Sequence, residues 1–214
     1  MFSRGNVKEK GRLLGFHEGS EDGRAVLDQR RREVKGKWAV DMYAGIGYFV
    51  FSYAKVGMRV VCWELNPWSV EGLRRGAERN GWSVRVVRGE ELRGKVVLGE
   101  ERITVLEESN EMCGRRMEEL GLGEGIVHVN CGFLPTSLAS WRTAWEVVDK
   151  GEGGWLHLHE NVGVEDIEKR REEMQSLFDG WGEDEVRSRV EHVELVKTFA
   201  PDVWHCVFDV YVNR

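Results

Sequence analysis

The chain alternates short apolar runs with longer stretches in which apolar residues recur every three or four positions. Continuous short runs are typical of strands buried on both faces of a parallel sheet, and the longer spacing is typical of amphipathic helices. Glycine or Asn-Gly follows several of the helical stretches, as expected where a helix ends. The expected strands are 37–43, 58–64, 84–87, 103–106, 126–129, 155–162, 193–199 and 205–212, and the expected helices are 48–56, 68–79, 112–120, 138–148 and 164–178.

Strands that alternate with helices predict an α/β domain with a mostly parallel, doubly wound sheet. The last two strands are separated only by Ala-Pro-Asp at 200–202, and so short a connection predicts an antiparallel hairpin at one end of the sheet. The irregular region 83–103 is interpreted as containing a surface insertion at 90–102. We expect residues 1–36 to form an N-terminal arm and residues 37–214 to form the main domain.

Composition narrows the class of protein. The 214 residues are 41% hydrophobic and 32% charged, which is typical of a globular chain. No apolar run approaches the roughly 20 residues that span a bilayer, and the N-terminus lacks the apolar core of a signal peptide, so a cytoplasmic protein is expected. The four cysteines show no CxxC spacing, which fits a reducing compartment. The net charge of −6 argues against broad, nonspecific binding of phosphates.

The segment DMYAGIGYF at 41–49 carries the strongest chemical signal. Asp41 ends the first strand, and Gly45 and Gly47 then form a turn in which backbone can approach a ligand closely. The start of the next helix offers unpaired N–H groups. Glu64 ends the second strand, where a carboxylate can accept both hydroxyls of a ribose. Together these residues predict a site for a nucleoside-containing cofactor.

Two residues differ from what a dinucleotide-binding site requires, and they indicate which cofactor is bound. The dinucleotide fingerprint requires glycine or alanine at the position of Val50, and Asp41 would repel a pyrophosphate while attracting an amino group or a sulfonium. The pattern therefore favours S-adenosylmethionine over NAD. His157 and His159 share one face of a strand, but no third ligand has a suitable spacing, so no metal is expected.

Several segments together resemble a known family. These are MFSRGNVKEK, DMYAGIGYF, WELNPWSVEGLRRGAERNG, VNCGFLPTSLASW, GGWLHLHENV and VKTFAPDVWHCVFDV, which are similar to the tRNA wybutosine-synthesizing aminocarboxypropyltransferases, relatives of the tRNA guanine-37 N1-methyltransferases. The resemblance implies a class I S-adenosylmethionine-dependent methyltransferase-like (Rossmann-like) fold of about seven strands. It also implies transfer of the 3-amino-3-carboxypropyl group of S-adenosylmethionine to 4-demethylwyosine at position 37 of tRNA(Phe), with release of methylthioadenosine.

The resemblance further implies roles for individual residues. Cofactor contacts are expected from Ser3, Lys10, Glu64, Ser109 and Asn110, with Ser109 standing where the family has an aspartate. We expect Asp41 and the Gly45–Gly47 turn to hold the aminocarboxypropyl end, and Asn130 and Pro135 to frame the target base. His159 and Glu160 are candidate bases, although a structural role for them is favoured.

Two alternative functions stay open. A tRNA guanine-37 N1-methyltransferase would share the fold and the cofactor, but those enzymes tend to have proline at the position of Tyr48, and NCGFLPTS also favours the aminocarboxypropyl branch. A non-catalytic cofactor-binding fragment is the third possibility, because relatives carry an additional N-terminal domain that grips tRNA. We expect that domain to be absent here or replaced by a partner subunit, with the anticodon loop of tRNA(Phe) as the main partner.

Overall fold

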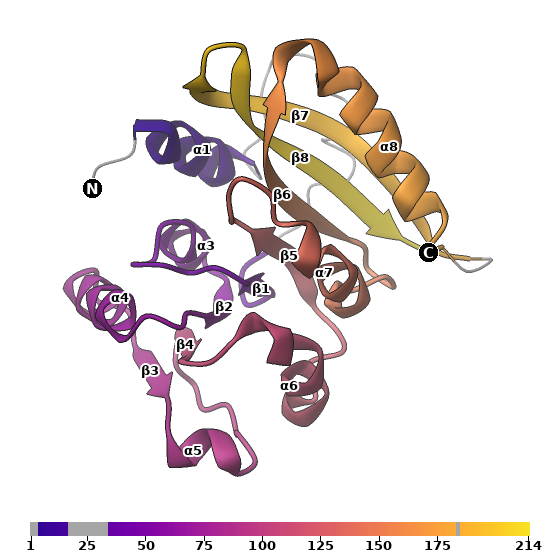
Figure 1. Cartoon of the computed structure of the whole chain (residues 1–214). Helices are drawn as coiled ribbons and strands as arrows, with labels where there is room; N and C mark the ends of the chain where they lie inside the picture. Colours follow the sequence, from indigo (N-terminus) through magenta and orange to yellow (C-terminus); the bar gives the residue numbers. More distant parts are fainter. Residues whose placement is uncertain (1–3, 17–33, 183–184) are drawn as a thin grey trace.

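The structure, a computed structural model, describes residues 4–16, 34–182 and 185–214, with side chains in the first helix described from Val7 onward. Eight strands form one mixed sheet in the order β3-β4-β2-β1-β5-β6-β8-β7 (Figure 1). The strands are β1 Trp38–Asp41, β2 Arg59–Trp63, β3 Val84–Val87, β4 Ile103–Leu106, β5 Ile126–Cys131, β6 Gly154–Gly163, β7 Arg187–Ala200 and β8 Val203–Asn213. The helices are α1 Arg4–Gly15, α3 Val50–Lys55, α4 Pro67–Arg79, α5 Glu90–Arg93, α6 Cys113–Leu120, α7 Trp141–Val147 and α8 Ile167–Asp179, with short 3₁₀ turns at Asn110–Met112, Leu138–Ser140 and Val164–Asp166.

The pairing of the strands confirms the expected fold class. Strands β1 to β6 pair in parallel, whereas β8 runs antiparallel to both β6 and β7. The resemblance implied about seven strands, and the additional one is β3, which pairs only with β4 at one edge of the sheet. Strand β1 lies between β2 and β5, so the chain order reverses direction across the sheet at β1.

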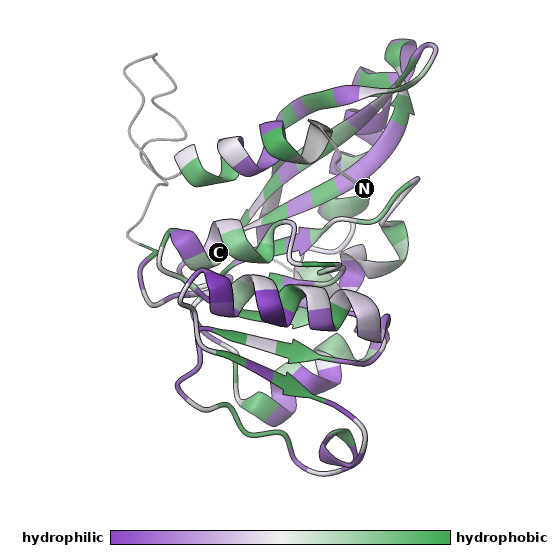
Figure 2. Cartoon of the chain, turned by 90° about the vertical axis from the view of Figure 1, so that its left-hand side faces the viewer, coloured by the Kyte–Doolittle hydropathy of each residue, from purple (hydrophilic) through white to green (hydrophobic). Residues whose placement is uncertain are grey.

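Helices cover both faces of the sheet, giving three layers (Figure 1). On one face, α6, α7 and α8 bury residues such as Met117, Trp141 and Phe178. On the other, α1, α3 and α4 bury residues such as Leu13 and Leu73. Trp141 and Trp145, which lie at helical spacing in α7, are buried in the core. In Figure 2 the short parallel strands are largely green, as expected for strands buried on both faces. The helices mix green and purple, as expected for helices buried on one face.

Helix α4 illustrates how local sequence sets an element. The side chain of Asn66 accepts a hydrogen bond from the N–H of Trp68, and Pro67 occupies the first helical position, where its missing N–H costs nothing. Val70, Leu73 and Ala77 form the buried stripe that their spacing predicts. Because α4 begins at Pro67, only residues 64–66 connect it to β2, and this short loop lies at the carboxyl ends of the parallel strands.

Three expectations change in detail. Helix α3 begins at Val50, two residues later than expected, because 42–49 form turns around Gly45 and Gly47. The region 90–102 is mostly exposed, but Val96 is buried and anchors it to the core. The described part of the N-terminal arm includes α1, whose Glu9 and Leu13 are buried against the rest of the domain. No helix within the described ranges is long and apolar enough to cross a bilayer.

Candidate functional site

A pocket of about 450 Å³ opens at the carboxyl ends of the four strands β4, β2, β1 and β5. In open α/β sheets a ligand binds in the crevice where the strand order reverses, and here that point lies between β1 and its neighbours β2 and β5. The pocket is lined by Met42, Tyr43, Gly45, Tyr48, Trp63, Glu64, Leu65, Glu108, Asn110, Gly132 and Phe133.

The glycine turn and Glu64 meet directly. The N–H of Gly45 donates to Oε2 of Glu64 at 2.8 Å, and the N–H of Asn66 donates to Oε1 at 2.7 Å. Gly45 and Gly47 have φ of 55° and 93°, a region that favours glycine. A Cβ at position 47 would also lie 2.6 Å from the ring of Phe51. The turn therefore requires glycine, and it holds the carboxylate at the pocket wall with each oxygen still able to accept another hydrogen bond.

Asp41 lies fully buried at the end of β1, directly before the pocket residue Met42. Its Oδ1 accepts hydrogen bonds at 3.1 Å from the N–H of Tyr43 and from the side-chain amide of Asn130. Burial raises its pKa to about 6, although these two hydrogen bonds act in the opposite direction. Oδ2 of Asp41 and Oδ1 of Asn130 are buried acceptors without a partner. Such a pair suits a ligand that brings an ammonium or another cation.

The loop after β4 closes the opposite side of the pocket. The side-chain amide of Asn110 donates to the backbone oxygen of Met42 at 2.9 Å, which ties this loop to the end of β1. Ser109 does not line the pocket; its Oγ accepts from the N–H of Glu111 and caps the 3₁₀ turn. Glu108 does line the pocket, and Arg116 binds its carboxylate through two hydrogen bonds of 2.8 and 2.9 Å.

The other expected site residues lie at varying distances from the pocket. Lys10 projects from α1 with Nζ 5.6 Å from the ring centroid of Tyr48, a pocket residue. Asn130, expected to frame a target base, is fully buried and is bonded to Asp41. Pro135 lies two residues beyond the last lining residue and accepts a hydrogen bond from the N–H of Asn161 at 2.8 Å. Ser3 lies outside the described residues.

The structure adds aromatic and apolar residues that sequence reasoning missed. Tyr43 and Phe133 follow the ends of β1 and β5, and their rings stack with centroids 5.1 Å apart and planes at 20°. Trp63 and Leu65 flank Glu64 on the β2 side. Their position within two residues of a strand's carboxyl end was the available signal, because parallel strands bring those ends to one edge.

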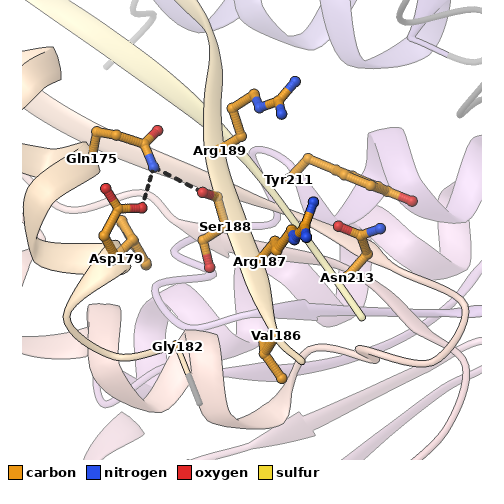
Figure 3. A pocket seen from close by; sticks show the side chains of 10 residues that line it. Gln175, Asp179, Gly182, Val186, Arg187, Ser188, Arg189, Tyr211 and Asn213 are labelled. Carbon is orange, nitrogen blue, oxygen red and sulfur yellow. Dashed lines mark hydrogen bonds between the residues drawn. The ribbon is translucent and has the colours of Figure 1, made fainter. Parts of the chain in front are cut away.

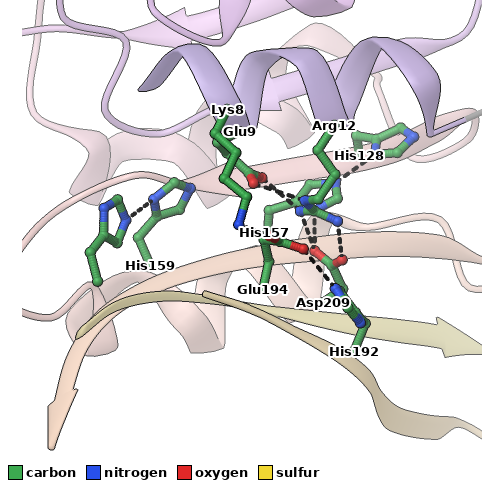
Figure 4. Close-up of polar contacts among 10 residues, drawn as sticks. Lys8, Glu9, Arg12, His128, His157, His159, His192, Glu194 and Asp209 are labelled. Carbon is green, nitrogen blue, oxygen red and sulfur yellow. Dashed lines mark hydrogen bonds and ion pairs between the residues drawn. The ribbon is translucent and has the colours of Figure 1, made fainter. Parts of the chain in front are cut away.

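A buried polar network lies beneath α1, away from the lining of this pocket (Figure 4). Arg12 donates hydrogen bonds to both Glu9 and Asp209, and Oδ1 of Asp209 lies 2.7 Å from Nδ1 of His157, from which it accepts a hydrogen bond. His128 lies 2.7 Å from the other ring nitrogen of His157. Burial opposes the charge, yet the pKa of Asp209 lies well below its usual range because Arg12 and His157 stabilise the carboxylate.

The two candidate bases have structural partners. Nδ1 of His159 lies 2.9 Å from Nε2 of His205, and burial holds the pKa of His159 well below its usual value. Glu160 pairs with Arg170 at 2.7 Å and accepts from Thr136. Within the described ranges, no group of three or more His, Cys, Asp or Glu side chains is placed to hold a metal ion.

A second hollow, of about 440 Å³, lies between α8, the start of β7 and the end of β8 (Figure 3). Gln175 on its wall donates to the backbone oxygen of Ser188 and accepts from the N–H of Val190, at 2.8 and 2.9 Å. These bonds occupy the backbone of the edge strand. The hollow lies at the opposite end of the sheet from the pocket described above.

Comparisons with known proteins place this geometry in context. No protein-family model matches the chain. It is 42% identical over 212 residues to tRNA wybutosine-synthesizing protein 2 of Schizosaccharomyces pombe, a match that covers 98% of this chain and 46% of the relative. It is 35% identical over 236 residues to the protein of the same name from Saccharomyces cerevisiae, covering 99% of this chain and 44% of the relative. The chain thus spans about half the length of the curated relatives that it matches.

Solved structures with low sequence identity share the fold. M. jannaschii TYW2 in complex with AdoMet superposes with a TM-score of 0.66 at 21% identity, covering 100% of this chain and 78% of that one. Trm5b from Pyrococcus abyssi superposes with a TM-score of 0.65 at 17% identity, covering 100% of this chain and 51% of that one. The methyltransferase-like fold expected from the sequence is confirmed.

Proposed function

We propose that this chain, which belongs to the family of tRNA wybutosine-synthesizing protein 2, carries the catalytic fold of a tRNA aminocarboxypropyltransferase. Its reaction would transfer the 3-amino-3-carboxypropyl group of S-adenosylmethionine to 4-demethylwyosine at position 37 of tRNA(Phe) in the cytoplasm, releasing methylthioadenosine. The observation that carries the proposal is the pair of unpartnered buried acceptors on Asp41 and Asn130, next to a glycine turn that binds Glu64. The solved TYW2 structure of M. jannaschii holds AdoMet, which supports the same choice of cofactor.

The residues present fit S-adenosylmethionine as a ligand. Glu64 has carboxylate oxygens able to accept ribose hydroxyls, and Leu65 and Trp63 add apolar surface beside it. Asp41 and Asn130 offer two acceptors to the amino group, and Asn110, on the pocket wall after β4, is proposed to contact the adenine. Lys10 and Ser3, the latter outside the described residues, are proposed as further contacts to the cofactor. We propose residues 37–214 as the cofactor-binding domain, with 1–36 as the arm that completes it.

The chemistry calls mainly for orientation. The sulfonium of S-adenosylmethionine supplies carbons that are already activated toward displacement, so neither a protein nucleophile nor a metal is invoked. What the chain contributes is a pocket that fixes which carbon meets the acceptor base. Anchoring the amino group near Asp41 holds the aminocarboxypropyl arm in place, and segment 130–135 at the end of β5 is proposed to frame the base.

One assay tests the proposal. Precursor tRNA(Phe) is incubated with the protein and S-adenosylmethionine, and both products are identified by mass. We expect methylthioadenosine and a nucleoside that carries the aminocarboxypropyl group. S-adenosylhomocysteine with methylated guanosine would instead support the methyltransferase, and cofactor binding without either product would support a non-catalytic fragment.

A matched pair of variants ties the product to this pocket. Glu64→Gln removes the charge that faces the ribose and should reduce product formation. Glu78→Gln, on the exposed face of α4 where Glu78 pairs with Arg74, should leave it unchanged. Equal activity of both variants would contradict the assignment of the pocket.

The proposed RNA partner sets a further requirement. The net charge of −6 gives the whole chain little general attraction for phosphates. We therefore propose that most phosphate contacts to tRNA come from additional protein, either linked to this chain or in a separate subunit. The chain described here would then supply the pocket that the anticodon loop enters.

A further inference from the structure

Two stacked rings, those of Tyr43 and Phe133, stand at one end of the pocket. Their planes differ by 20° and their centroids are 5.1 Å apart. Tyr43 is half-buried, whereas Phe133 is 52% exposed. One face of Phe133 is therefore covered by Tyr43, while much of the rest of the ring faces solvent.

The order of the strands separates these rings from the nucleoside end of the pocket. Glu64 follows β2, whereas Phe133 follows β5, on the other side of β1. Neighbouring strands lie about 4.8 Å apart, so β5 is roughly 10 Å from β2. If Glu64 holds the ribose, as the proposed function states, the transferred group points toward β1 and β5. Phe133 then lies beside the group that the acceptor base must meet.

The loop that carries Phe133 is tied to the sheet. Pro135 accepts a hydrogen bond from the N–H of Asn161 at 2.8 Å, and the hydroxyl of Thr136 donates to Glu160 at 2.8 Å. Arg170 in turn holds Glu160 from α8. These bonds fix the backbone close to Phe133, and the stack on Tyr43 orients its ring, which reduces the ordering needed when a flat partner binds.

We propose that Phe133, backed by Tyr43, is the platform on which the acceptor base of the RNA stacks. Enzymes that modify a base must take it out of its stack, and proteins recognise such unstacked bases of RNA loops by stacking them on aromatic side chains. Phe133 is thus a substrate-binding residue that orients the base beside the transferred group. The inference rests on the proposed function for the direction of the cofactor in the pocket.

The test uses a fluorescent RNA, an anticodon stem-loop with 2-aminopurine at position 37, together with the full chain. Stacking on a protein ring quenches 2-aminopurine, so we expect quenching by the unmodified protein and by Phe133→Tyr. Phe133→Ala should abolish the quenching and weaken RNA binding by about 5- to 150-fold, the range of one base–aromatic stack. Phe199→Ala removes an equally exposed ring at the end of β7, away from the pocket, and should change neither quantity.

Calorimetric binding of S-adenosylmethionine to the same variants completes the test. Phe133→Ala should weaken cofactor binding far less than it weakens RNA binding, because Phe133 lines the pocket but the proposed anchors of the cofactor are Glu64 and Asp41. Retained cofactor binding also shows that the variant is folded. A loss of cofactor affinity with unchanged quenching would mean that the ring covers the cofactor, and it would overturn the proposal. Equal affinity of the unmodified protein and of Phe133→Ala for the RNA would overturn it as well. Failure of the proposed function is read separately, from the identity of the products in the mass assay.

Discussion

At the scale of single residues, Asp41 is the most informative group in the molecule. It is a carboxylate in the core of a sheet, with one oxygen satisfied by Tyr43 and Asn130 and the other left without a partner. Its pKa of about 6, against 3.8 for an ordinary aspartate, means that ionising Asp41 at neutral pH costs the folded state about 3 kcal/mol. A protein that retains such a cost at its pocket is poised to bind a cation there.

This cost has a measurable dependence on pH. The folded state binds the Asp41 proton more tightly than the unfolded state, so the free energy of unfolding should fall as pH rises from about 4 to about 6. Affinity for a cationic ligand should change in the opposite direction, decreasing up to tenfold per unit as pH drops below about 6. Chemical denaturation and calorimetry across pH 4–8 measure both effects.

The neutral variant Asp41→Asn provides the control for this prediction. It keeps an oxygen to accept from Tyr43 but carries no charge, so its stability should lack the step between pH 4 and 6 that Asp41 produces. Its affinity for S-adenosylmethionine should be lower at pH 7. An unchanged affinity at that pH would show that Asp41 does not contact the cofactor.

At the scale of elements, α1 is held by charge as well as by packing. Arg12 lies between the buried carboxylates of Glu9 and Asp209, and Lys8 pairs with Glu194 on β7. Removing one partner of a buried ion pair leaves an uncompensated charge, which costs far more than losing a surface pair. Since α1 also carries Lys10 to Tyr48, the same contacts position this helix beside the pocket.

Arg12→Met should therefore lower the free energy of unfolding by about 3–5 kcal/mol, measured by urea denaturation. The double variant Arg12→Met with Asp209→Asn should recover part of the loss, because one of the two buried carboxylates that have lost Arg12 is then replaced by a neutral amide. Arg115→Met, which breaks the exposed Arg115–Glu119 pair, should change stability by less than about 1 kcal/mol. Equal losses for Arg12→Met and Arg115→Met would show that the buried network is not what holds α1.

The elements themselves were largely predictable, and the buried network was not. Apolar runs located all eight strands, and the helix expected at 68–79 differs from α4 by one residue at its start. The meeting of Gly45 with Glu64 also followed from the rule that ligands bind at the carboxyl ends of strands. The partners of Arg12 lie up to 197 positions away, however, and no local spacing encodes such a contact. For the same reason, the role of Asn130 as a partner of Asp41 emerged only when β1 and β5 were seen side by side.

At the scale of the whole molecule, β7 forms one edge of the sheet, and part of its outer backbone is hydrogen-bonded by the side chain of Gln175. The amide of Gln175 bonds the N–H of Val190 and the backbone oxygen of Ser188, in the way that a neighbouring strand would. An open edge strand is a template for pairing with another chain. Gln175 therefore protects β7 from such pairing along this stretch.

Gln175→Ala should lower the free energy of unfolding by about 1–3 kcal/mol, because it leaves the backbone groups of β7 unpaired. The variant should also associate more at high concentration, as measured by light scattering. Asp179→Ala removes only the other bond of the Gln175 amide and should affect both quantities little. Association of the two variants to the same degree would contradict a protective role for the contacts with β7.

The position of β1 in the sheet has a consequence for synthesis on the ribosome. Strand β2 can pair with β1 soon after both emerge, but β5, which covers the other edge of β1, ends 90 positions after Asp41. At about 5–20 residues per second, that edge waits roughly 5–18 seconds for its partner. During this interval the growing chain presents β1, three apolar residues followed by Asp41, with one edge unpaired. Nascent-chain chaperones and translation speed across 42–131 should therefore govern how much of the protein reaches its folded state.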